Sequence, residues 1–508
     1  MTDAQHAPGS AAADGAVSDA APDFTDADLE TCLRVLGAIH TLPDDDDRFI
    51  AVRHGTSRMF KEVKRYRKAV ARREVQEHDR AVAERTATGA PDRLDDETLG
   101  LPLSSGTDGD SAGEYLRPRG CYVCKRDYTR ADAFHHALCP ECAEAGRAWR
   151  NARTDLTGRR ALLTGGRAKI GMHIALRLLR DGARTTITTR FPHDAARRFA
   201  AVEDSGDWLH RLRIVGIDLR DPAQVISLAD RVAADGPLDI LINNAAQTVR
   251  RSAGSYRHLV ENESRPLPPE LTPAHGGPEV LGGGHSPQEH PKALAAAFHL
   301  QAAELTQTEA MDPVRLAGLA MTAGSASLER IGAGTAIDAG GLVPDVVSQN
   351  SWTQVLGEVD PLELLEVQLC NVTAPFLLAS RLRPALAASD ARRKYIVNVS
   401  AMEGQFSRRY KGAGHPHTNM AKAGLNMLTR TSAEELFTED NILMTAVDTG
   451  WITDERPHDD KFRHAADGWH APLDLIDGAA RVYHPVVAGE AGLDLYGCFL
   501  KDYARSPW

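Results

Sequence analysis

The sequence predicts a doubly wound α/β domain with a mainly parallel sheet, preceded by a helical arm and a small four-cysteine zinc module. Three observations carry this prediction. From residue 160 onwards, short apolar runs of strand type alternate with helical stretches, which is typical of β-α-β units. Two C-x-x-C pairs lie just before that region. Ahead of the pairs, apolar residues recur at helical spacing.

Length and composition exclude several classes of protein. The chain has 508 residues, enough for roughly three domains, so it is not a small disulfide-stapled module. Its 59 Lys and Arg are outnumbered by 70 Asp and Glu, which gives a net charge of −11. The chain as a whole is therefore not a binder of bulk polyanions, and any basic patch must be local.

Cysteine usage and the N-terminal composition predict a compartment. Four of the seven cysteines lie within 22 residues of one another, which indicates metal binding under reducing conditions and not a disulfide framework. The first residues contain neither a basic nor an apolar segment of signal-peptide type, and no long apolar run occurs further along the chain. We therefore expect a cytoplasmic protein that does not bind membranes.

The N-terminal region is predicted to be a disordered tail at 1–22 and a helical arm at 23–90. The tail consists mostly of Ala, Asp, Gly, Pro and Ser, and such a composition buries too little apolar surface to fold. Thr25 and Asp28 form a capping-box pattern ahead of the first amphipathic helix. Residues 91–116, rich in Gly, Pro, Ser, Thr and Asp, are predicted to be a linker.

A second and longer helix of the arm is predicted after the carboxylates of residues 44–47, which suit the positive end of a helix dipole. Between residues 58 and 85 it carries ten Lys or Arg against five acids. This polar face is either a solvated surface or a contact surface for an acidic protein or a nucleic acid. The apolar stripe of the same helix contains Met59, Val63, Tyr66 and Val70.

The cysteine quartet predicts a zinc module at 117–150. Two C-x-x-C turns, each presenting two sulfurs, complete a tetrahedron around one ion, and four protein ligands leave no open position for catalysis. The site is therefore predicted to be structural, bracing the arm against the α/β domain. Free or redox-active thiols and a rubredoxin-like iron site are the alternatives, and a zinc ribbon can also bind protein or nucleic acid. The predicted ligands are Cys121, Cys124, Cys139 and Cys142. His135 and His136, between the pairs, are expected to be surface or packing residues.

The remaining residues, 156–508, are predicted to form the α/β domain. A strand ending in ALLTGG, a helix beginning at KIGMH and a second strand, RTTITTR, make a β-α-β unit with a phosphate-binding turn. Four further strand-like segments come after this unit. An insertion is expected at about 252–350, beside the substrate cleft at the carboxyl edge of the sheet, where it would be a lid or an interaction surface. Within it we expect a helix at 293–304, and the irregular spacing of His275, His285 and His290 argues against a metal site.

Several motifs in chain order resemble those of the short-chain dehydrogenase/reductase family. They are Thr164, Gly165 and Gly171 in the glycine turn, Asp218 after the third strand, the run Asn243, Asn244, Ala245 and Ala246, then Asn371 and Lys422. The resemblance implies a Rossmann fold, a nicotinamide dinucleotide and chemistry at a carbonyl or hydroxyl group, with Asn371, Lys422 and Thr418 as the candidate catalytic residues. It also implies cofactor contacts from Thr164, Gly165, Gly166, Arg167, Lys169, Ile170, Gly171, Arg190, Asp218, Asn244, Ala245 and Lys422.

The departures from the family pattern concern the chemistry directly. Lys169 stands where the family has a glycine, Thr418 where it has the catalytic Tyr, and Ala401 where it has the catalytic Ser. Ser400 is one position early and would point to the other side of its strand. A Thr hydroxyl is a poor general acid, so Thr418 either relays a proton or caps the helix that carries Lys422. The neighbouring loop offers other proton carriers, namely Tyr410, Lys411, His415 and His417.

Arg190, at the end of the second strand, favours NADP over NAD, because a basic residue there suits a 2′-phosphate. The leading hypothesis is a zinc-containing NADP-dependent oxidoreductase with an atypical active site, acting on an unidentified small molecule. The alternative is a catalytically silent dinucleotide-binding scaffold or sensor that engages a macromolecule. The C-terminal segment from Tyr496 should supply a last strand, at an edge through which the family commonly forms homo-oligomers.

Overall fold

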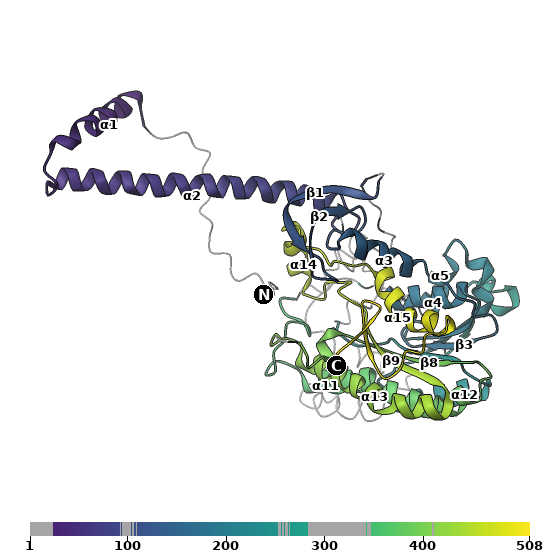
Figure 1. The fold of residues 1–508 in the computed structure, drawn as a ribbon. Helices are drawn as coiled ribbons and strands as arrows, with labels where there is room; N and C mark the ends of the chain where they lie inside the picture. Colours follow the sequence, from purple (N-terminus) through teal and green to yellow (C-terminus); the bar gives the residue numbers. More distant parts are fainter. Residues whose placement is uncertain are drawn as a thin grey trace. The chain divides into compact units, whose positions relative to one another are not determined.

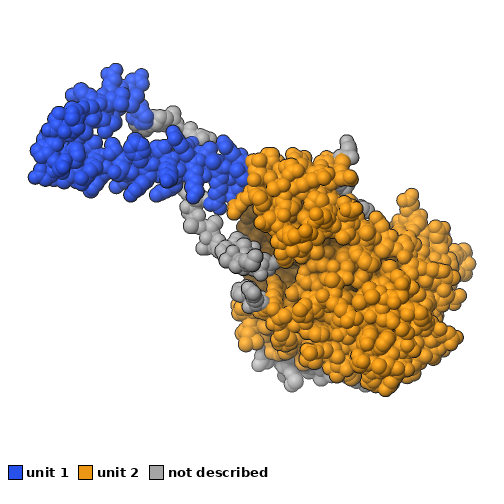
Figure 2. Space-filling model, viewed as in Figure 1, with its two compact units in different colours: residues 1–77 blue, residues 78–508 orange. Residues whose placement is uncertain are grey.

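The computed structural model describes residues 24–91, 109–251, 265–282, 347–408 and 411–508, together with residues 93, 103, 106, 107, 256, 259, 263 and 342. The chain divides into two compact units, residues 1–77 and 78–508, which Figure 2 distinguishes by colour. The expected tail at 1–22 and helix at 293–304, and the residues His285, His290 and Tyr410, lie outside the described residues.

The arm contains the two predicted helices. Helix α1 (Asp26–Ala38) begins at Thr25, whose side chain and that of Asp28 form the predicted reciprocal capping box. A short 3₁₀ turn, Ile39–Thr41, comes next. Helix α2 (Asp47–Glu84) is then one continuous helix of 38 residues, whose buried residues all lie in its last two turns.

The cysteine module begins earlier than the sequence predicts. Strands β1 (Ser111–Gly120) and β2 (Asp127–Asp132) form an antiparallel pair, and helix α3 (Pro140–Arg150) comes after them. The last part of the predicted linker, 111–116, is therefore strand. Its composition is that of a linker, but Ala112 and Tyr115 are buried in the core of the module, and this tertiary packing decides the local structure.

A nine-stranded sheet forms the centre of the second unit, in the order β11-β10-β9-β8-β6-β3-β4-β5-β7. All neighbouring strands are parallel except the last pair, β10 and β11. The strands are β3 (Arg160–Leu163), β4 (Arg184–Thr189), β5 (Leu212–Gly216), β6 (Ile240–Asn243), β7 (Glu279–Leu281), β8 (Lys394–Ser400), β9 (Ile442–Asp448), β10 (Phe499–Lys501) and β11 (Ala504–Ser506). The predicted C-terminal strand is thus present as β10.

Helices cover both faces of the sheet, as in Figure 1, so the predicted doubly wound α/β fold is confirmed. One apolar core joins the sheet to α4 (Lys169–Arg180), α5 (Pro192–Ala200) and α15 (Leu475–Glu490). The other joins it to α6 (Pro222–Ala234), α12 (Ala374–Ala387) and α13 (Pro416–Asp440). Helix α11 (Pro361–Gln368) continues into α12 through a π-helical turn, and α14 (His458–Ala466) lies between β9 and α15 in the chain. Short 3₁₀ turns occupy Ser205–Asp207, Leu209–Arg211, Pro269–Leu271, Pro273–His275 and Met402–Gly404.

The first part of the insertion extends the β5 edge of the sheet. Strand β7 pairs with β5 in parallel. The Glu263 carboxylate accepts hydrogen bonds from the backbone N–H groups of His193 (2.7 Å) and Asp194 (3.2 Å), in the first turn of α5. Strand β7 satisfies the open hydrogen bonds of an edge strand, so this part of the insertion packs against β5 and α5. Another residue of the insertion, Tyr256, contacts Arg190.

Among the described residues, one helical stretch, Pro361–Ala387, is long and apolar enough to cross a membrane by length and composition alone. Half of its most apolar portion is buried, and Leu378, Leu382 and Leu386 belong to the core on one face of the sheet. A core helix of a soluble protein has the same properties.

Candidate functional site

The turn after β3 is held against the loop after β6 by side-chain hydrogen bonds. The Thr164 hydroxyl accepts from the backbone N–H groups of Asn244 and Ala245, both at 3.0 Å. The Asn244 amide donates to the carbonyls of Thr164 (3.0 Å) and Gly165 (3.1 Å). A Cβ on Gly171 would lie 2.0 Å from the Gly165 carbonyl oxygen, so only glycine permits this close approach. The turn therefore keeps the compact backbone that phosphate binding requires.

Lys169, at the position where the family pattern has a glycine, has a left-handed backbone conformation. Its φ of 52° lies in the left-handed region, which costs a non-glycine residue about 1–2 kcal/mol. Its Nζ lies 3.9 Å from a carboxylate oxygen of Glu455, and the Arg251 guanidinium lies 4.0 Å from the other. Burial alone would raise the pKa of Glu455, but Lys169, Lys461 and Arg251 lower it to about 2. A carboxylate thus lies among cations at the phosphate-binding turn.

Two other residues of the turn, Ile170 and Arg167, contact the protein itself: Ile170 packs in the core and Arg167 forms an ion pair. Ile170 packs against the apolar core that contains α4 and α15. The Arg167 guanidinium donates to Asp194 at 2.5 Å and lies over the Phe191 ring.

Arg190 and Asp218 lie at the end of the site nearest β5. Arg190 donates to the Tyr256 hydroxyl at 3.1 Å and lies over the Tyr256 ring. The Asp218 carboxylate accepts hydrogen bonds from the Arg220 guanidinium, the shortest at 2.6 Å. Burial opposes the charge on Asp218, but Arg220 and Arg190 hold its pKa well below the usual range. Asp218 is therefore a charged group at the position expected for an adenine contact.

Asn371 lies in the π-helical turn Leu369–Thr373, and its side chain is hydrogen-bonded to the backbone of Gln247 in the loop after β6. Its side-chain oxygen accepts from the Gln247 N–H at 2.7 Å, and its amide donates to the Gln247 carbonyl at 3.0 Å. Gln247 in turn donates to Glu366, which also accepts from Arg220. This chain of hydrogen bonds connects Asp218 to Asn371. Such π turns are frequent at functional sites because they re-aim a side chain out of the helical register.

Lys422 is buried at the carboxyl end of β8. Its Nζ donates to the Val399 carbonyl at 2.8 Å, and burial lowers its pKa to about 8. The Ser400 hydroxyl donates to the side-chain oxygen of Asn426 at 2.5 Å, one turn after Lys422 in α13.

Thr418 is not the N-cap of α13. That position belongs to His415, which has a left-handed backbone with φ of 43° and makes no side-chain cap hydrogen bond. Thr418 lies in the first turn, and its hydroxyl donates to the His415 carbonyl at 2.9 Å. The N-cap prediction was wrong because Pro416 suits the first helical position, so the helix starts three residues earlier than a Thr418 cap would allow.

The described members of the neighbouring loop have partners of their own. The Lys411 ammonium donates to the carbonyls of Met402 and Glu403, both at 2.6 Å. The His415 ring stacks on Trp352, and burial lowers its pKa. His417 is buried beside Glu363, with 3.6 Å between its Nε2 and the carboxylate.

Two residues near the site were not identified from the sequence. Asp448, the last residue of β9, is 5% exposed, and burial raises the pKa of its carboxyl to about 6. Tyr122, inside the first C-x-x-C turn, accepts a hydrogen bond at 2.9 Å from the Trp451 N–H, in the loop after β9. An acid at the carboxyl end of a parallel strand is a usable signal for Asp448. No local signal exists for Tyr122, because its contact joins distant parts of the chain.

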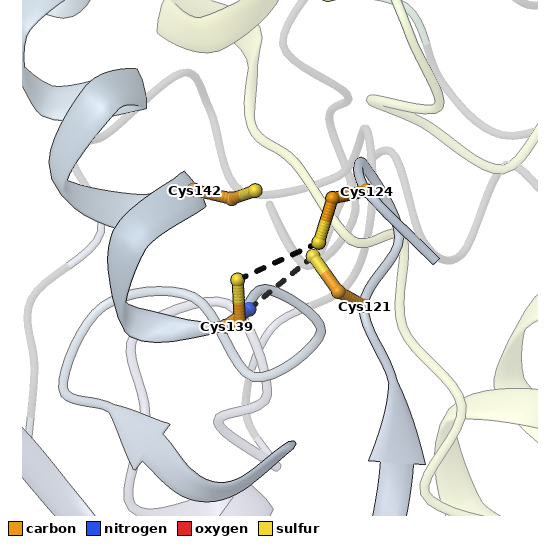
Figure 3. Close-up of side chains that lie close together, drawn as sticks. All are labelled: Cys121, Cys124, Cys139 and Cys142. Carbon is orange, nitrogen blue, oxygen red and sulfur yellow. Dashed lines mark hydrogen bonds between the residues drawn. The ribbon is translucent and has the colours of Figure 1, made fainter. Parts of the chain in front are cut away.

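The four predicted metal ligands converge, as Figure 3 shows. All four sulfurs lie within 4.8 Å of one another, with 3.8 Å between those of Cys124 and Cys139. The Cys139 N–H also donates to the Cys121 sulfur at 3.3 Å. Four thiol ligands at these separations fit a tetrahedral, closed zinc site.

The module is attached to the α/β domain by buried charges. His135 is completely buried, so it is a packing residue, and its Nε2 lies 2.9 Å from the Asp477 carboxylate at the start of α15. Arg150 reaches the same carboxylate at 2.9 Å and bonds Asp474 at 2.5 Å. These contacts join the two cysteine pairs to the helix that packs on α4.

The parallel sheet with helices on both faces, and a glycine turn between β3 and α4, define an α/β protein of the dinucleotide-binding type. A family model described as short chain dehydrogenase matches residues 159–261. Over these residues the chain is similar to the short-chain dehydrogenase/reductase family, whose motifs the sequence resembles.

Relatives and solved structures show how far the similarity extends. An uncharacterised protein of Acanthamoeba polyphaga mimivirus is 29% identical over 379 residues, covering 72% of this chain and 71% of the relative. A probable oxidoreductase of Streptomyces antibioticus is 43% identical over 94 residues, which is 18% of this chain and only 30% of the relative. A short chain dehydrogenase from Burkholderia cenocepacia, solved in complex with NADP, is 21% identical with a TM-score of 0.40, covering 68% of this chain and 97% of that one.

Proposed function

We propose that the protein is an NAD(P)-dependent oxidoreductase that acts on a carbonyl or hydroxyl group of a small molecule, with NADP preferred. The observation that carries this proposal is the buried Lys422 at the carboxyl end of β8, on the same sheet edge as the glycine turn. Parallel strands end together at one edge, which is where ligands of open α/β sheets bind.

The residues at this edge fit a dinucleotide. Gly165, Gly166 and Gly171 keep the turn compact, because a Cβ at any of them would lie 3.0 Å or less from a neighbouring protein atom. The Asn244 side-chain oxygen is buried without a hydrogen-bond partner in the described part of the chain. In this proposal Lys169 would pair with phosphates and Arg190 with a 2′-phosphate. The bound nicotinamide would supply the hydride chemistry, while Asn371 orders the β6 loop and Lys422 holds a positive charge beside the reacting group.

Replacing Lys422 with Met tests this function. Removal of the ammonium should lower the rate of NADPH-dependent carbonyl reduction by about 10²-fold or more. Because the Lys422 pKa is about 8, the ammonium is present below that pH, so the wild-type rate should fall as pH rises through about 8 and the Met variant should lack this limb. The control is Lys394→Met, which removes another buried lysine at the opposite end of β8. An unchanged rate and pH profile in Lys422→Met would refute the role of Lys422.

A second candidate function, a catalytically silent dinucleotide-binding scaffold, is favoured by the absence of a free hydroxyl at the family's two catalytic positions. Position 401 is Ala, and the Thr418 hydroxyl donates a hydrogen bond to the His415 carbonyl. NADPH titration monitored by nucleotide fluorescence, followed by a broad panel of carbonyl substrates, separates the two functions. Tight binding without hydride exchange supports the scaffold. Substrate turnover that survives Thr418→Val supports an enzyme whose proton donor is another residue, such as His417 or Asp448.

Glu455 sets the affinity for the dinucleotide in this proposal, because its carboxylate competes with phosphate for Lys169 and Arg251. Glu455→Gln removes the negative charge and should tighten NADPH binding by about tenfold, or about 1.4 kcal/mol. Calorimetric titration measures this change, with the exposed Glu270→Gln as the charge-matched control. Weaker binding by Glu455→Gln would mean that Glu455 positions the cations for the phosphates and does not compete with them.

We further propose that Cys121, Cys124, Cys139 and Cys142 bind one structural zinc ion. The support is the convergence of the four sulfurs and the closed ligand set that they make. Because such an ion contributes binding free energy to folding, its loss should destabilise the module around it.

A further inference from the structure

The arm carries an apolar stripe that the described residues leave uncovered. Helix α2 has 38 residues, and the only buried ones are Asp79, Val82 and Ala83 near its end. Upstream, Met59 is 48% exposed, Val63 40% and Tyr66 54%. Helix α1 does not bury this stripe, since none of its own residues is buried. Long helices in proteins owe most of their stability to packing of such a face, so a helix of this kind requires a partner.

The spacing of the stripe identifies the kind of partner. Apolar or small residues alternate at intervals of three and four positions, which is the heptad period of a coiled coil and not the wider face of a core helix. We call these residues the heptad seam: Phe49, Val52, Thr56, Met59, Val63, Tyr66 and Val70. Phe49, Thr56, Val63 and Val70 then occupy a positions, where β-branched residues favour two strands.

The flanking charges select a second copy of the same helix in parallel orientation. In that frame Glu62 is a g residue and Arg67 is the e residue of the following heptad, so the two face each other across a parallel dimer, twice by symmetry. Arg48 would meet Arg53 of the partner subunit, but Asp46 already pairs with Arg48 at 2.7 Å and offsets that repulsion.

We propose that the protein self-associates through a parallel two-stranded coiled coil of helix α2, formed along the heptad seam. The basic b, c and f positions, including Lys61, Lys64 and Lys68, remain on the outside of the pair. The arm is thus a dimerisation element separate from the α/β domain, and this inference does not depend on the proposed function.

Site-specific disulfide trapping of the full chain tests the proposal. In a Cys32→Ser background, which removes the exposed cysteine of α1, Met59→Cys places one thiol on the seam of each chain and Ser57→Cys places it on the outside. Paired thiols on the seam meet at an effective concentration of order millimolar, so Met59→Cys should cross-link at least about tenfold faster than Ser57→Cys at micromolar protein. Equal rates, or no cross-linking at position 59, would overturn the proposal.

A second test, which changes charged residues beside the seam, applies even if a cysteine on the seam alters the helix. In the Met59→Cys background, Glu62→Arg and Arg67→Glu each place like charges across the pair, so each variant alone should cross-link several-fold more slowly. Mixed together, they should form mainly heterodimers, because both contacts between positions 62 and 67 are then between opposite charges. A mixture that yields no excess of heterodimer contradicts the parallel pairing. If the arm does not cross-link but binds duplex DNA in a salt-sensitive way, its basic face is a nucleic-acid contact surface. That result would also refute the dimer.

Discussion

Chelation of the metal, or Cys124→Ser, is expected to unfold the cysteine module while the nine-stranded sheet remains folded. The apolar core of the module is small: Val82, Ala83, Ala112, Tyr115, Tyr128, Ala131, Leu138, Ala143 and Leu473 surround the cysteines. Zinc contributes about 10–16 kcal/mol of apparent binding free energy in small modules at pH 7, which exceeds what such a core supplies. Without metal, the four thiols are held near one another only by the small core and by weak hydrogen bonds, such as that between the sulfurs of Cys124 and Cys139.

Metal analysis and limited proteolysis measure this outcome. One zinc ion per wild-type chain, none in Cys124→Ser, and new cleavage between residues 111 and 150 in the variant are the expected results. Cys32→Ser, which changes an exposed thiol in α1, is the matched control and should retain the metal. Unfolding of the module should also disturb the candidate site. The Tyr122 hydroxyl accepts a hydrogen bond from the Trp451 N–H, and Trp451 lies in the loop that carries Glu455. A module that stays resistant to protease after complete chelation would contradict a structural role for zinc.

Asp477→Ala is expected to destabilise the second unit by about 3–5 kcal/mol, since it leaves buried positive charge uncompensated. The Asp477 carboxylate is 1% exposed and pairs with His135 and Arg150. It also completes the capping box of α15 with Asp474. Denaturant unfolding of the variant measures the loss. The exposed Asp390→Ala, expected to change stability by less than about 0.5 kcal/mol, is the control.

The same contact predicts a pH dependence. Burial alone would lower the pKa of His135, but Asp477 and Asp132 raise it above the usual value of 6.5. The imidazolium therefore contributes stability that is fully present below pH 6.5 and is lost as pH rises through the raised pKa. The free energy of unfolding of the wild type should fall over that range relative to His135→Gln. Parallel pH profiles for the two proteins would show that His135 is neutral in the folded state.

The cysteine cluster and the glycine turn were predictable because their information is local. A C-x-x-C turn places two sulfurs on one ion whatever surrounds it, and Gly171 is required by a contact with Gly165 a few residues away. The sequence also predicts the position of Lys422 and Asn371, since strand ends and helix starts can be read from short motifs.

Thr418 and β1 show where local reading fails. The hydroxyl of Thr418 suits an N-cap, but Pro416 begins α13 earlier and His415 takes the cap position. Residues 111–116 have the composition of a linker, yet they pair with β2 and bury Ala112 and Tyr115. In both cases neighbouring structure outweighs the preference of the residue itself.

The sequence by itself determined the α/β fold, the cluster of four cysteines, the glycine turn and the absence of a Tyr at position 418 and a Ser at position 401. Only the tertiary structure brought Glu455 to Lys169, Tyr122 to the loop after β9, and His135 to Asp477. Periodicity and motif spacing report on residues within a few turns or strands of one another. Contacts between charged groups far apart in the chain form only when the packing of the core brings their elements together and removes the water between them.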